Sequence, residues 1–188
     1  GRGVFSFCVC PGGQVVAAAS EPGRVVTNGM SHYARSGENI NGGMLVGVTP
    51  EDFGTDHPLA GVAWQRQLEE AAFRLGGGGF LAPCQRVEDF LAHRPSTGPG
   101  AVLPSYRPGV TWCDLHDCLP GFLTEAMEQA LPLLERKLRG YAQPDALLTA
   151  VETRSSSPVR ILRDESGQSA LRGLYPCGEG AGYAGGIL

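Results

Sequence analysis

The sequence has no hydrophobic run long enough to cross a membrane and no concentration of basic residues. None of its apolar runs approaches the roughly 18 uninterrupted residues of a spanning helix. Its 15 basic and 19 acidic residues give a formal net charge of −4, and no stripe of Lys or Arg could neutralise phosphates. The first residues, Gly1 to Phe5, lack the apolar region of a signal peptide. We therefore expect a cytoplasmic protein with no membrane span and no nucleic-acid partner.

The six cysteines include no C-x-x-C pair and no finger-like spacing. A chain of 188 residues with 42% hydrophobic residues can bury a core without disulfides, so we expect reduced thiols. Cys8 and Cys10 share one face of a predicted strand and are interpreted as core residues. Cys113, His116 and Cys118 lie close together, but no second Cys/His pair completes a tetrahedral site, and we expect no metal. The other histidines considered stand alone and are interpreted as structural or exposed: His32, His57 and His93.

Glycine and proline are abundant, at 28 and 14 residues, and predict many tight turns. The first fifty residues are typical of a strand-rich meander. Its predicted strands are Val4–Cys10, Gln14–Ala19, Arg24–Thr27 and Met44–Val48, and its predicted turns include Pro11–Gly13 and Asn28–Gly29.

Two longer segments carry apolar residues at helical spacing. The first helix is predicted over Leu59–Leu75, with Asp56 as a candidate N-cap and Gly76 as its end. The second is predicted over Gly121–Arg139, where Pro132 should kink or split it. A short helix over Val87–Ala92 and a Pro- and Gly-rich loop over His93–Gly109 lie between them.

Three further strands are predicted near the end of the chain: Ala146–Thr153, Val159–Leu162 and Leu171–Cys177. Strands mixed irregularly with two main helices favour an α+β (mixed α/β) fold over a repeated βαβ array.

The final segment runs from a predicted strand into a glycine-dense loop. Gly180, Gly182 and Gly185 match G-x-G-x-x-G, a pattern that lets backbone N–H groups approach a pyrophosphate. The helix, second strand and acidic residue of a complete fingerprint do not follow within the sequence. On composition alone, a flexible glycine-rich linker is the alternative interpretation.

Four segments spread along the chain together resemble a family of bacterial FAD-dependent dehydrogenases whose substrates are uncharacterised. These segments are Phe7–Gly13, Val26–Ser31, Val151–Arg160 and Leu174–Gly186. The resemblance implies a flavoprotein with a split, Rossmann-like FAD-binding domain. It further implies that the opening G-x-G-x-x-G lies outside this sequence, so that the chain is a partial one that does not bind FAD tightly alone.

The resemblance also implies roles for the glycine-dense loop. Glu179 would hydrogen-bond a hydroxyl of FAD, and the neighbouring glycines would supply backbone contacts: Gly178, Gly180, Gly182, Gly185 and Gly186. The expected organisation is a substrate-side domain over residues 1–170, with parts contributed to the FAD domain, and an FAD-contacting strand and loop over residues 171–188. The missing FAD-domain segment of the same polypeptide would be a partner.

Arg154 and Arg160 flank a Ser/Pro turn that contains Ser156, and together they are candidates for binding an anionic small-molecule substrate. Solvated or ion-paired arginines are the alternative. No catalytic residue is identified, and an amine, alcohol, quinone or polyprenyl substrate stays open. The leading hypothesis is thus part of an FAD-dependent oxidoreductase. A non-catalytic interaction domain, which docks through its glycine-rich tail and the surface near Tyr175 and Tyr183, is the alternative.

Overall fold

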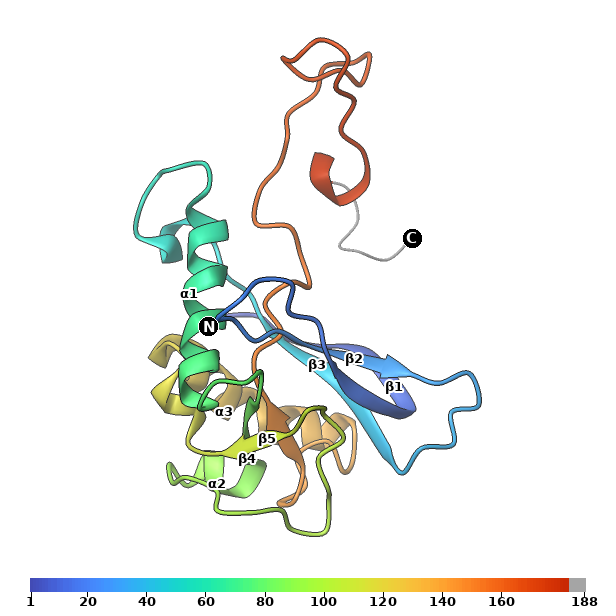
Figure 1. Cartoon of the computed structure of the whole chain (residues 1–188), viewed down its shortest axis with the longest axis vertical. Coiled ribbons are helices and arrows are strands. Elements are labelled where there is room, and N and C mark those ends of the chain that lie inside the picture. Colours follow the sequence, from blue (N-terminus) through green and yellow to red (C-terminus); the bar gives the residue numbers. More distant parts are fainter. Residues whose placement is uncertain (183–188) are drawn as a thin grey trace. The chain divides into compact units, whose positions relative to one another are not determined.

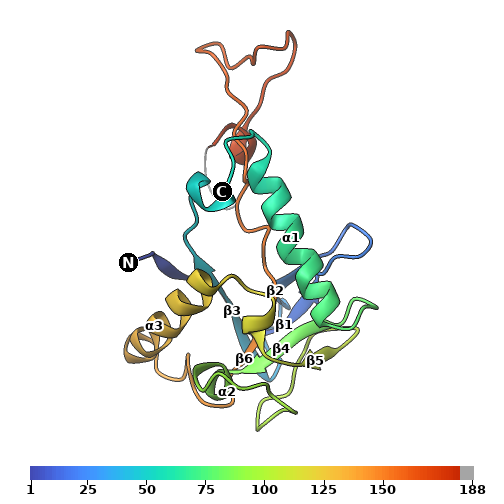
Figure 2. The same ribbon diagram turned by 90° about the vertical axis from the view of Figure 1, so that its left-hand side faces the viewer.

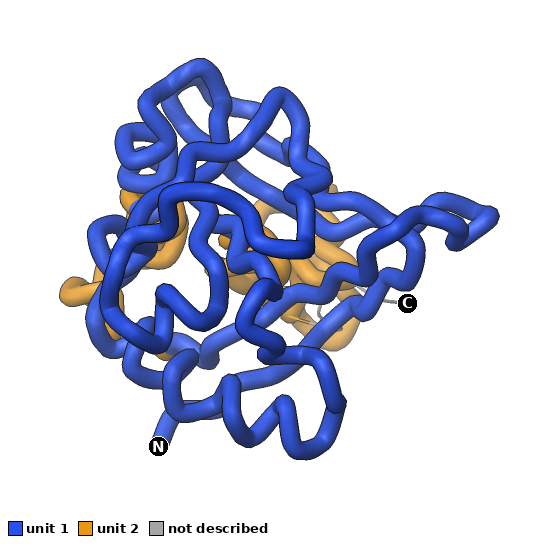
Figure 3. Tube along the Cα trace, turned by 90° about the horizontal axis from the view of Figure 1, so that it is seen from below, with its two compact units in different colours: residues 1–48, 68–152 blue, residues 49–67, 153–188 orange. Residues whose placement is uncertain are grey.

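A computed structural model describes residues 1–182 of the chain and divides it into two compact units, each made of two separate stretches. Unit 1 comprises Gly1–Val48 and Leu68–Glu152, and unit 2 comprises Thr49–Gln67 and Thr153–Leu188 (Figure 3). Each unit therefore forms only when segments distant in the sequence come together.

The first sheet of unit 1 is an antiparallel sheet with the strand order β2-β1-β3 (Figure 1). Its strands are β1 (Val4–Ala17), β2 (Thr27–Ser31) and β3 (Asn39–Val46). β1 pairs with β3 through its first part and with β2 through its last part, and its register with β3 shifts twice between Phe7 and Gly13. A long bent strand with two partners thus replaces the predicted succession of short strands.

Two turns predicted in this sheet are wrong. Pro11–Gly13 lies within β1, and Asn28–Gly29 lies within β2, where it pairs with residues Val16 and Val15. A Cβ on Gly13 would stand 1.9 Å from the carbonyl oxygen of Met30, so this glycine permits a close approach of two backbones. Glycine here serves a bulged strand, and the sequence pattern does not distinguish a bulge from a turn.

The second sheet of unit 1 has the order β5-β4-β6, with β4–β5 parallel and β4–β6 antiparallel. Its strands are β4 (Ala82–Arg86), β5 (Val110–Trp112) and β6 (Leu147–Thr149). The central strand β4 is almost entirely buried. The sequence analysis did not predict β4, because Pro83 and Gln85 interrupt its apolar pattern. β6 is much shorter than the strand predicted over residues 146–153.

In residues 1–182, three α-helices accompany these sheets (Figure 2). α1 (Ala60–Leu75), α2 (Val87–Leu91) and α3 (Gly121–Lys137) lie within two residues of the predicted bounds, and residues 93–109 form a loop as predicted. Asp56 does not cap α1, which begins four residues later. α3 runs continuously through Pro132, so the predicted split is wrong. Pro132 is exposed at this point, which leaves the buried face of α3 intact.

The core of unit 1 gathers side chains from β4, α2, α3, the loop over residues 93–109 and the 3-10 turn at Leu115–Asp117. The largest fully buried side chains include Phe90, Tyr106, Leu115 and Leu131. The Gln85 side chain is also fully buried, and it donates to the Arg94 carbonyl and accepts from the Leu115 N–H. These hydrogen bonds satisfy a polar group that would otherwise destabilise the core.

Unit 2 has little regular secondary structure in the part of it that the structure describes. It contains a 3-10 turn η1 (Pro50–Phe53), the first part of α1, a long irregular segment after Thr153, and the 3-10 turn η3 (Gly178–Ala181). The strands predicted at Val159–Leu162 and Leu171–Cys177 do not form. Both segments are mostly exposed, and within the described residues they make single backbone hydrogen bonds, such as Leu174 N–H to Leu171 O and Ile161 N–H to Gly180 O, instead of a ladder with a neighbouring strand.

The combination of two sheets and three helices confirms the α+β fold class. The Rossmann-like fragment stays a prediction. Within residues 1–182, no helix has the length and apolar character needed to traverse a bilayer.

Candidate functional site

The predicted cofactor-contacting residues lie on the 3-10 turn η3 of unit 2. Gly178, Glu179 and Gly180 belong to this turn, and Gly182 follows it directly. Gly178 has φ +55° and Gly182 has φ +81°, left-handed values that side chains other than glycine rarely adopt. The other two predicted glycines, Gly185 and Gly186, lie outside the described residues. The turn therefore depends on glycine at two of the four positions that can be placed.

The predicted substrate residues lie on a second turn of unit 2, at residues 153–160. Arg154, Ser156 and Arg160 are all exposed. Gln65 of α1 holds this turn by donating through its side-chain amide to the Thr153 carbonyl at 2.7 Å and to the Ser156 carbonyl at 3.4 Å. A Cβ on Gly61 would stand 2.8 Å from Pro158, so the first part of α1 also packs closely against the turn.

Two hydrogen bonds join these turns. A carboxylate oxygen of Glu179 accepts from the Ser157 N–H. Four residues after Ser157, the Ile161 N–H donates to the Gly180 carbonyl at 2.8 Å. Among the described residues, the structure thus brings the predicted cofactor residues 178–182 close to the turn of the predicted substrate residues, although 18 positions separate Arg160 from Gly178 in the sequence.

The surroundings of the glycines differ from one to the next. A Cβ on Gly178 or Gly180 would meet no heavy atom within 4 Å. A Cβ on Gly182 would stand 2.7 Å from Cδ of Arg160. The first two glycines therefore leave room for a ligand to approach their backbone, whereas Gly182 brings the chain against the Arg160 side chain.

The segment between the two turns is fixed by its own hydrogen bonds. The Arg163 guanidinium donates to the Pro176 carbonyl at 2.8 Å, and the Gln168 side chain accepts from the Gly173 N–H at 2.7 Å. Several large apolar side chains are exposed here, most of all Leu162 (74%), Leu171 (69%) and Tyr175 (60%). Exposed apolar side chains gathered in one segment are typical of surfaces that bind another polypeptide segment or another protein.

The cysteines fall into two groups. Cys84, Cys113 and Cys118 are buried, and burial raises the pKa of these thiols to about 12, about 11 and about 12. Thiols held protonated in this way are poor nucleophiles and metal ligands. Cys8 and Cys10 are not core residues as predicted: Cys8 is exposed and Cys10 partly so. Cys8 has φ 48° at the register shift of β1, which breaks the side-chain alternation on which the prediction depended.

One cluster of polar side chains was missed by the sequence analysis. His93 does not stand alone: its ring stacks on the ring of His116 at 4.6 Å between centroids, and both approach Glu128 of α3. His116 also hydrogen-bonds Asp114. His93 lies two residues after the end of α2, and His116 and Glu128 belong to the turn η2 (Leu115–Asp117) and to α3. Their spacings have no common period, so the sequence carries no signal for the cluster.

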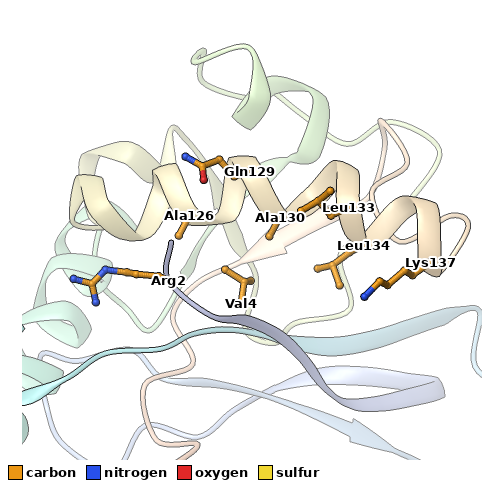
Figure 4. A pocket seen from close by; sticks show the side chains of 8 residues that line it. All are labelled: Arg2, Val4, Ala126, Gln129, Ala130, Leu133, Leu134 and Lys137. Atoms are coloured by element: carbon orange, nitrogen blue, oxygen red, sulfur yellow. The ribbon is translucent and has the colours of Figure 1, made fainter.

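A pocket in unit 1 lies between the start of β1 and α3 (Figure 4). Figure 4 shows Val4, Ala130 and Leu134 facing its interior, with Arg2 and Lys137 toward its two ends. Its lining contains no carboxylate, histidine or thiol. The pocket therefore offers shape and positive charge, but no group suited to acid–base chemistry, and none of the predicted site residues lines it.

Comparison with known proteins gives two findings. A family model described as "FAD-dependent protein, C-terminal domain-like" matches residues 1–155. The chain is also 52% identical over its full 188 residues to an uncharacterised protein of Clostridium beijerinckii. That alignment covers 100% of the chain and 35% of the relative, so the chain spans about a third of the length of the relative.

Proposed function

The chain belongs to the FAD-dependent protein C-terminal domain-like family, and from this premise we propose that it acts as the substrate-side part of an FAD-dependent oxidoreductase. In this proposal the residues that hold FAD come mainly from polypeptide outside these 188 residues, and the η3 turn adds the last contacts. The relative, of which the chain covers 35%, has length to supply that polypeptide. A cytoplasmic location stays a prediction of the sequence.

The observation that carries the proposal is the joining of the η3 turn to the Ser/Pro turn at residues 153–160. Because the Glu179 carboxylate accepts from the Ser157 N–H, a cofactor contact at η3 would stand next to the residues proposed to bind substrate. A carboxylate has about four acceptor sites, so this hydrogen bond leaves Glu179 able to accept from a hydroxyl of FAD. The open surroundings of Gly178 and Gly180 fit a backbone that a cofactor approaches closely.

When bound, the flavin supplies the electron or hydride transfer. The residues of this chain would bind and orient. The Arg160 guanidinium, exposed beside Gly182, is suited to bind a carboxylate or phosphate group of the substrate. Arg154 and Ser156, on the same turn, would add charge and a hydroxyl donor. Gln65 holds this turn from α1, and would thereby fix the distance between substrate and cofactor contacts.

The exposed apolar segment at residues 161–175 fits the same proposal. If most of the FAD domain lies elsewhere in the polypeptide, part of this chain has to pack against it. Leu162, Leu171 and Tyr175 are exposed and would be covered in that assembly. The same observation favours the alternative of an interaction domain without a flavin, so the experiment has to separate the two.

The test is a chimera in which this chain replaces the matching 188 residues of the Clostridium beijerinckii relative. We expect the purified chimera to be yellow, with flavin absorbance bands, and its Glu179→Gln variant to retain less FAD. Glu165→Gln, an exposed glutamate of the same unit, is the matched control and should retain FAD fully.

Two outcomes would overturn the proposal. A folded but colourless chimera that takes up no added FAD would exclude a flavoprotein. A chimera that binds FAD, but whose flavin is unaffected by removing residues 173–188, would exclude the η3 contact. If this same segment transfers binding of the remainder of the relative to a fused carrier protein in the absence of FAD, the interaction-domain alternative is favoured.

A further inference from the structure

The His93, His116 and Glu128 side chains of unit 1 place three metal-binding atoms close together. One ligand atom from each residue lies within 4.8 Å of the other two. Nε2 of His93 is 3.3 Å and Nε2 of His116 is 2.9 Å from the same oxygen of Glu128, Oε1. In a tetrahedral zinc site with metal–ligand bonds of roughly 2.1 Å, neighbouring ligand atoms are about 3.4 Å apart. The observed spacings are close to that value.

From this geometry we propose that His93, His116 and Glu128 form a binding site for a divalent first-row transition metal ion. Two imidazole nitrogens and one carboxylate oxygen suit Zn²⁺, Co²⁺ or Ni²⁺ better than Mg²⁺ or Ca²⁺, which prefer oxygen ligands throughout. Three protein ligands leave at least one coordination position for water. None of its residues belongs to the η3 turn or the Ser/Pro turn on which the proposed flavin function rests.

Asp114 gives the cluster the second feature of a metal site, a partner that orients the ligating histidine. Its Oδ1 lies 2.6 Å from Nδ1 of His116 and also accepts from the His116 backbone N–H and from the Gln85 side chain. A carboxylate accepts hydrogen bonds, so it places the proton on Nδ1 and leaves Nε2 of the neutral ring as the free ligand. Metal-binding histidines usually have such a partner.

Ion pairing without a metal is the competing explanation for these contacts. Burial works against a charged His116, but its hydrogen bonds to the Glu128 and Asp114 carboxylates raise the pKa of the imidazole above its ordinary value. Ion pairing accounts for His116 between two carboxylates and for the approach of His93 Nε2 to Glu128 at 3.3 Å. It also leaves one carboxylate oxygen shared by two imidazole nitrogens, which is the arrangement that a metal ion would occupy, so metal titration has to separate the two explanations.

The position of His93 fits this role. It follows α2 directly, with φ 51°, a left-handed backbone that costs energy in residues other than glycine. This conformation holds the ring against His116, with 26° between the ring planes. Nearly parallel rings do not aim their lone pairs at one point, so the His93 ring has to turn as the metal enters. Its side chain is 63% exposed, so solvent gives the ring room to turn.

The metal would replace the proton between His116 and Glu128, so binding releases a proton. It would connect the loop after α2 and the turn η2 to the helix α3. The buried thiols nearby stay outside the site, because Cys113 and Cys118 donate to the carbonyls of Cys84 and Leu115.

The experiment is calorimetric titration of the whole chain with Zn²⁺ and, separately, with Co²⁺ at neutral pH. It uses a background in which the less buried cysteines Cys8, Cys10 and Cys177 are replaced by serine, since thiolates bind the same ions. We expect one equivalent to bind, and a Co²⁺ spectrum without the charge-transfer bands of thiolate ligands. Because His93 is mostly exposed, His93→Ala should keep the fold, and we expect it to lower the affinity by at least about tenfold.

Matched variants separate the proposal from ion pairing. His57→Ala removes an exposed histidine of unit 2 and should leave the affinity unchanged. Asp114→Asn should lower the affinity about 10- to 100-fold, as loss of an orienting partner does. Absence of binding in the serine background, or binding that His93→Ala leaves unchanged, would overturn the proposal and leave only an ion pair. Circular dichroism of each variant shows whether the fold is retained.

Discussion

At the scale of single residues, the Glu179 side chain supplies one of the two hydrogen bonds that join the two turns of unit 2. Its carboxylate accepts from the Ser157 N–H across 22 positions of sequence. In Glu179→Gln the acceptor loses its charge, and hydrogen bonds to charged groups are about twice as strong as neutral ones. We expect the Ser157 amide to exchange with solvent about fivefold faster, as measured by NMR hydrogen exchange.

The control for this prediction is Glu165→Gln, which removes the same charge elsewhere in the unit. Ile161 provides an internal comparison, because its N–H donates to the Gly180 carbonyl rather than to Glu179. Equal exchange of Ser157 in the two variants would mean that the carboxylate does not hold the turn.

Asp89 is the residue whose charge the stability of unit 1 depends on most clearly. It is buried, and it accepts from Nε of Arg94 at 2.5 Å and from the Ser96 hydroxyl at 2.7 Å. Burial opposes its charge, but these hydrogen bonds and the charges of Arg94 and Arg86 lower the pKa of Asp89 below its ordinary value. A lowered pKa in the folded state contributes stability above the ordinary pKa of aspartate, and that contribution is lost as the pH falls through the lowered value.

We therefore expect Asp89→Asn to destabilise the protein by about 1–2 kcal/mol at neutral pH, since the mostly exposed Arg94 and the Ser96 hydroxyl lose a charged acceptor, whereas Arg86 keeps Asp145 and Glu88. The difference in unfolding free energy between this variant and the unaltered protein should become smaller as the pH falls below the ordinary pKa of aspartate. Urea unfolding at several pH values measures both effects. A difference that stays constant over this range would show that the charge of Asp89 does not contribute.

At the scale of secondary-structure elements, the close approach of Gly13 in β1 to β2 can be tested directly. A Cβ at this position would stand 1.9 Å from the Met30 carbonyl oxygen, which is a backbone atom that cannot turn aside. We expect Gly13→Ala to separate the end of β1 from β2 and to cost at least about 2 kcal/mol of unfolding free energy. Gly42→Ala in β3 is the matched control, because its Cβ would make an ordinary contact at 3.6 Å with Val9. A similar loss of unfolding free energy in Gly13→Ala and Gly42→Ala would show that the close approach of Gly13 to Met30 is not the cause.

α3 presents the opposite case, a proline that the helix tolerates. Pro132 is exposed, and it deprives the carbonyl four residues earlier of its hydrogen bond without ending the helix. We expect Pro132→Ala to raise the unfolding free energy by about 1–3 kcal/mol, because alanine restores that bond and suits a helix better. Gln129→Ala, a substitution at an exposed position of the same helix, should change the unfolding free energy by less than about 0.5 kcal/mol. A lower melting temperature for Pro132→Ala would show that the proline shapes α3.

The elements differ in how far the sequence predicts them. α1 and α3 follow from apolar residues at helical spacing over four turns or more, a signal that needs no knowledge of neighbours. β4 could not be predicted, because Pro83 and Gln85 are tolerated only through partners: Gln85 is satisfied by Arg94 and Leu115, which the folded chain brings to it. Conversely, Val159–Leu162 has the composition of a strand, but no strand lies beside it.

The same distinction applies to the candidate site. The glycines of η3 and the arginines of the Ser/Pro turn are visible as local patterns. The hydrogen bond between Glu179 and Ser157 depends on how the intervening residues 161–175 fold back, and no local pattern encodes that path. The His93, His116 and Glu128 cluster is a still harder case, because each residue belongs to a different element.

At the scale of the whole molecule, the contacts divide the chain at three places, between residues 48 and 49, 67 and 68, and 152 and 153. The sequence analysis assumed continuous domains over residues 1–170 and 171–188, an organisation argued from the expected function, and it stays a prediction. α1 crosses one of the divisions, so a single helix belongs to both units. Truncation at any one of these points would therefore leave an incomplete core.

The division also predicts two classes of stability within one chain. Backbone groups of unit 1 are paired in the buried sheet around β4, including Cys113 N–H to Cys84 O and Ala150 N–H to Pro83 O. In unit 2, amides such as Ser169 and Leu174 bond only within exposed local turns. Local opening exposes such turns without disturbing a core, so we expect the amides of Ser169 and Leu174 to exchange at least about a hundredfold faster than those of Cys113 and Ala150.

Urea provides a second test. Because exchange of the Cys113 and Ala150 amides requires global unfolding, low concentrations of urea should accelerate it, whereas exchange of the Ser169 amide should stay unchanged. Equal protection of the two sets of amides from exchange would instead mean that residues 159–177 unfold only together with the sheets. The exposed apolar surface of unit 2 would then be rigid even before another polypeptide covers it.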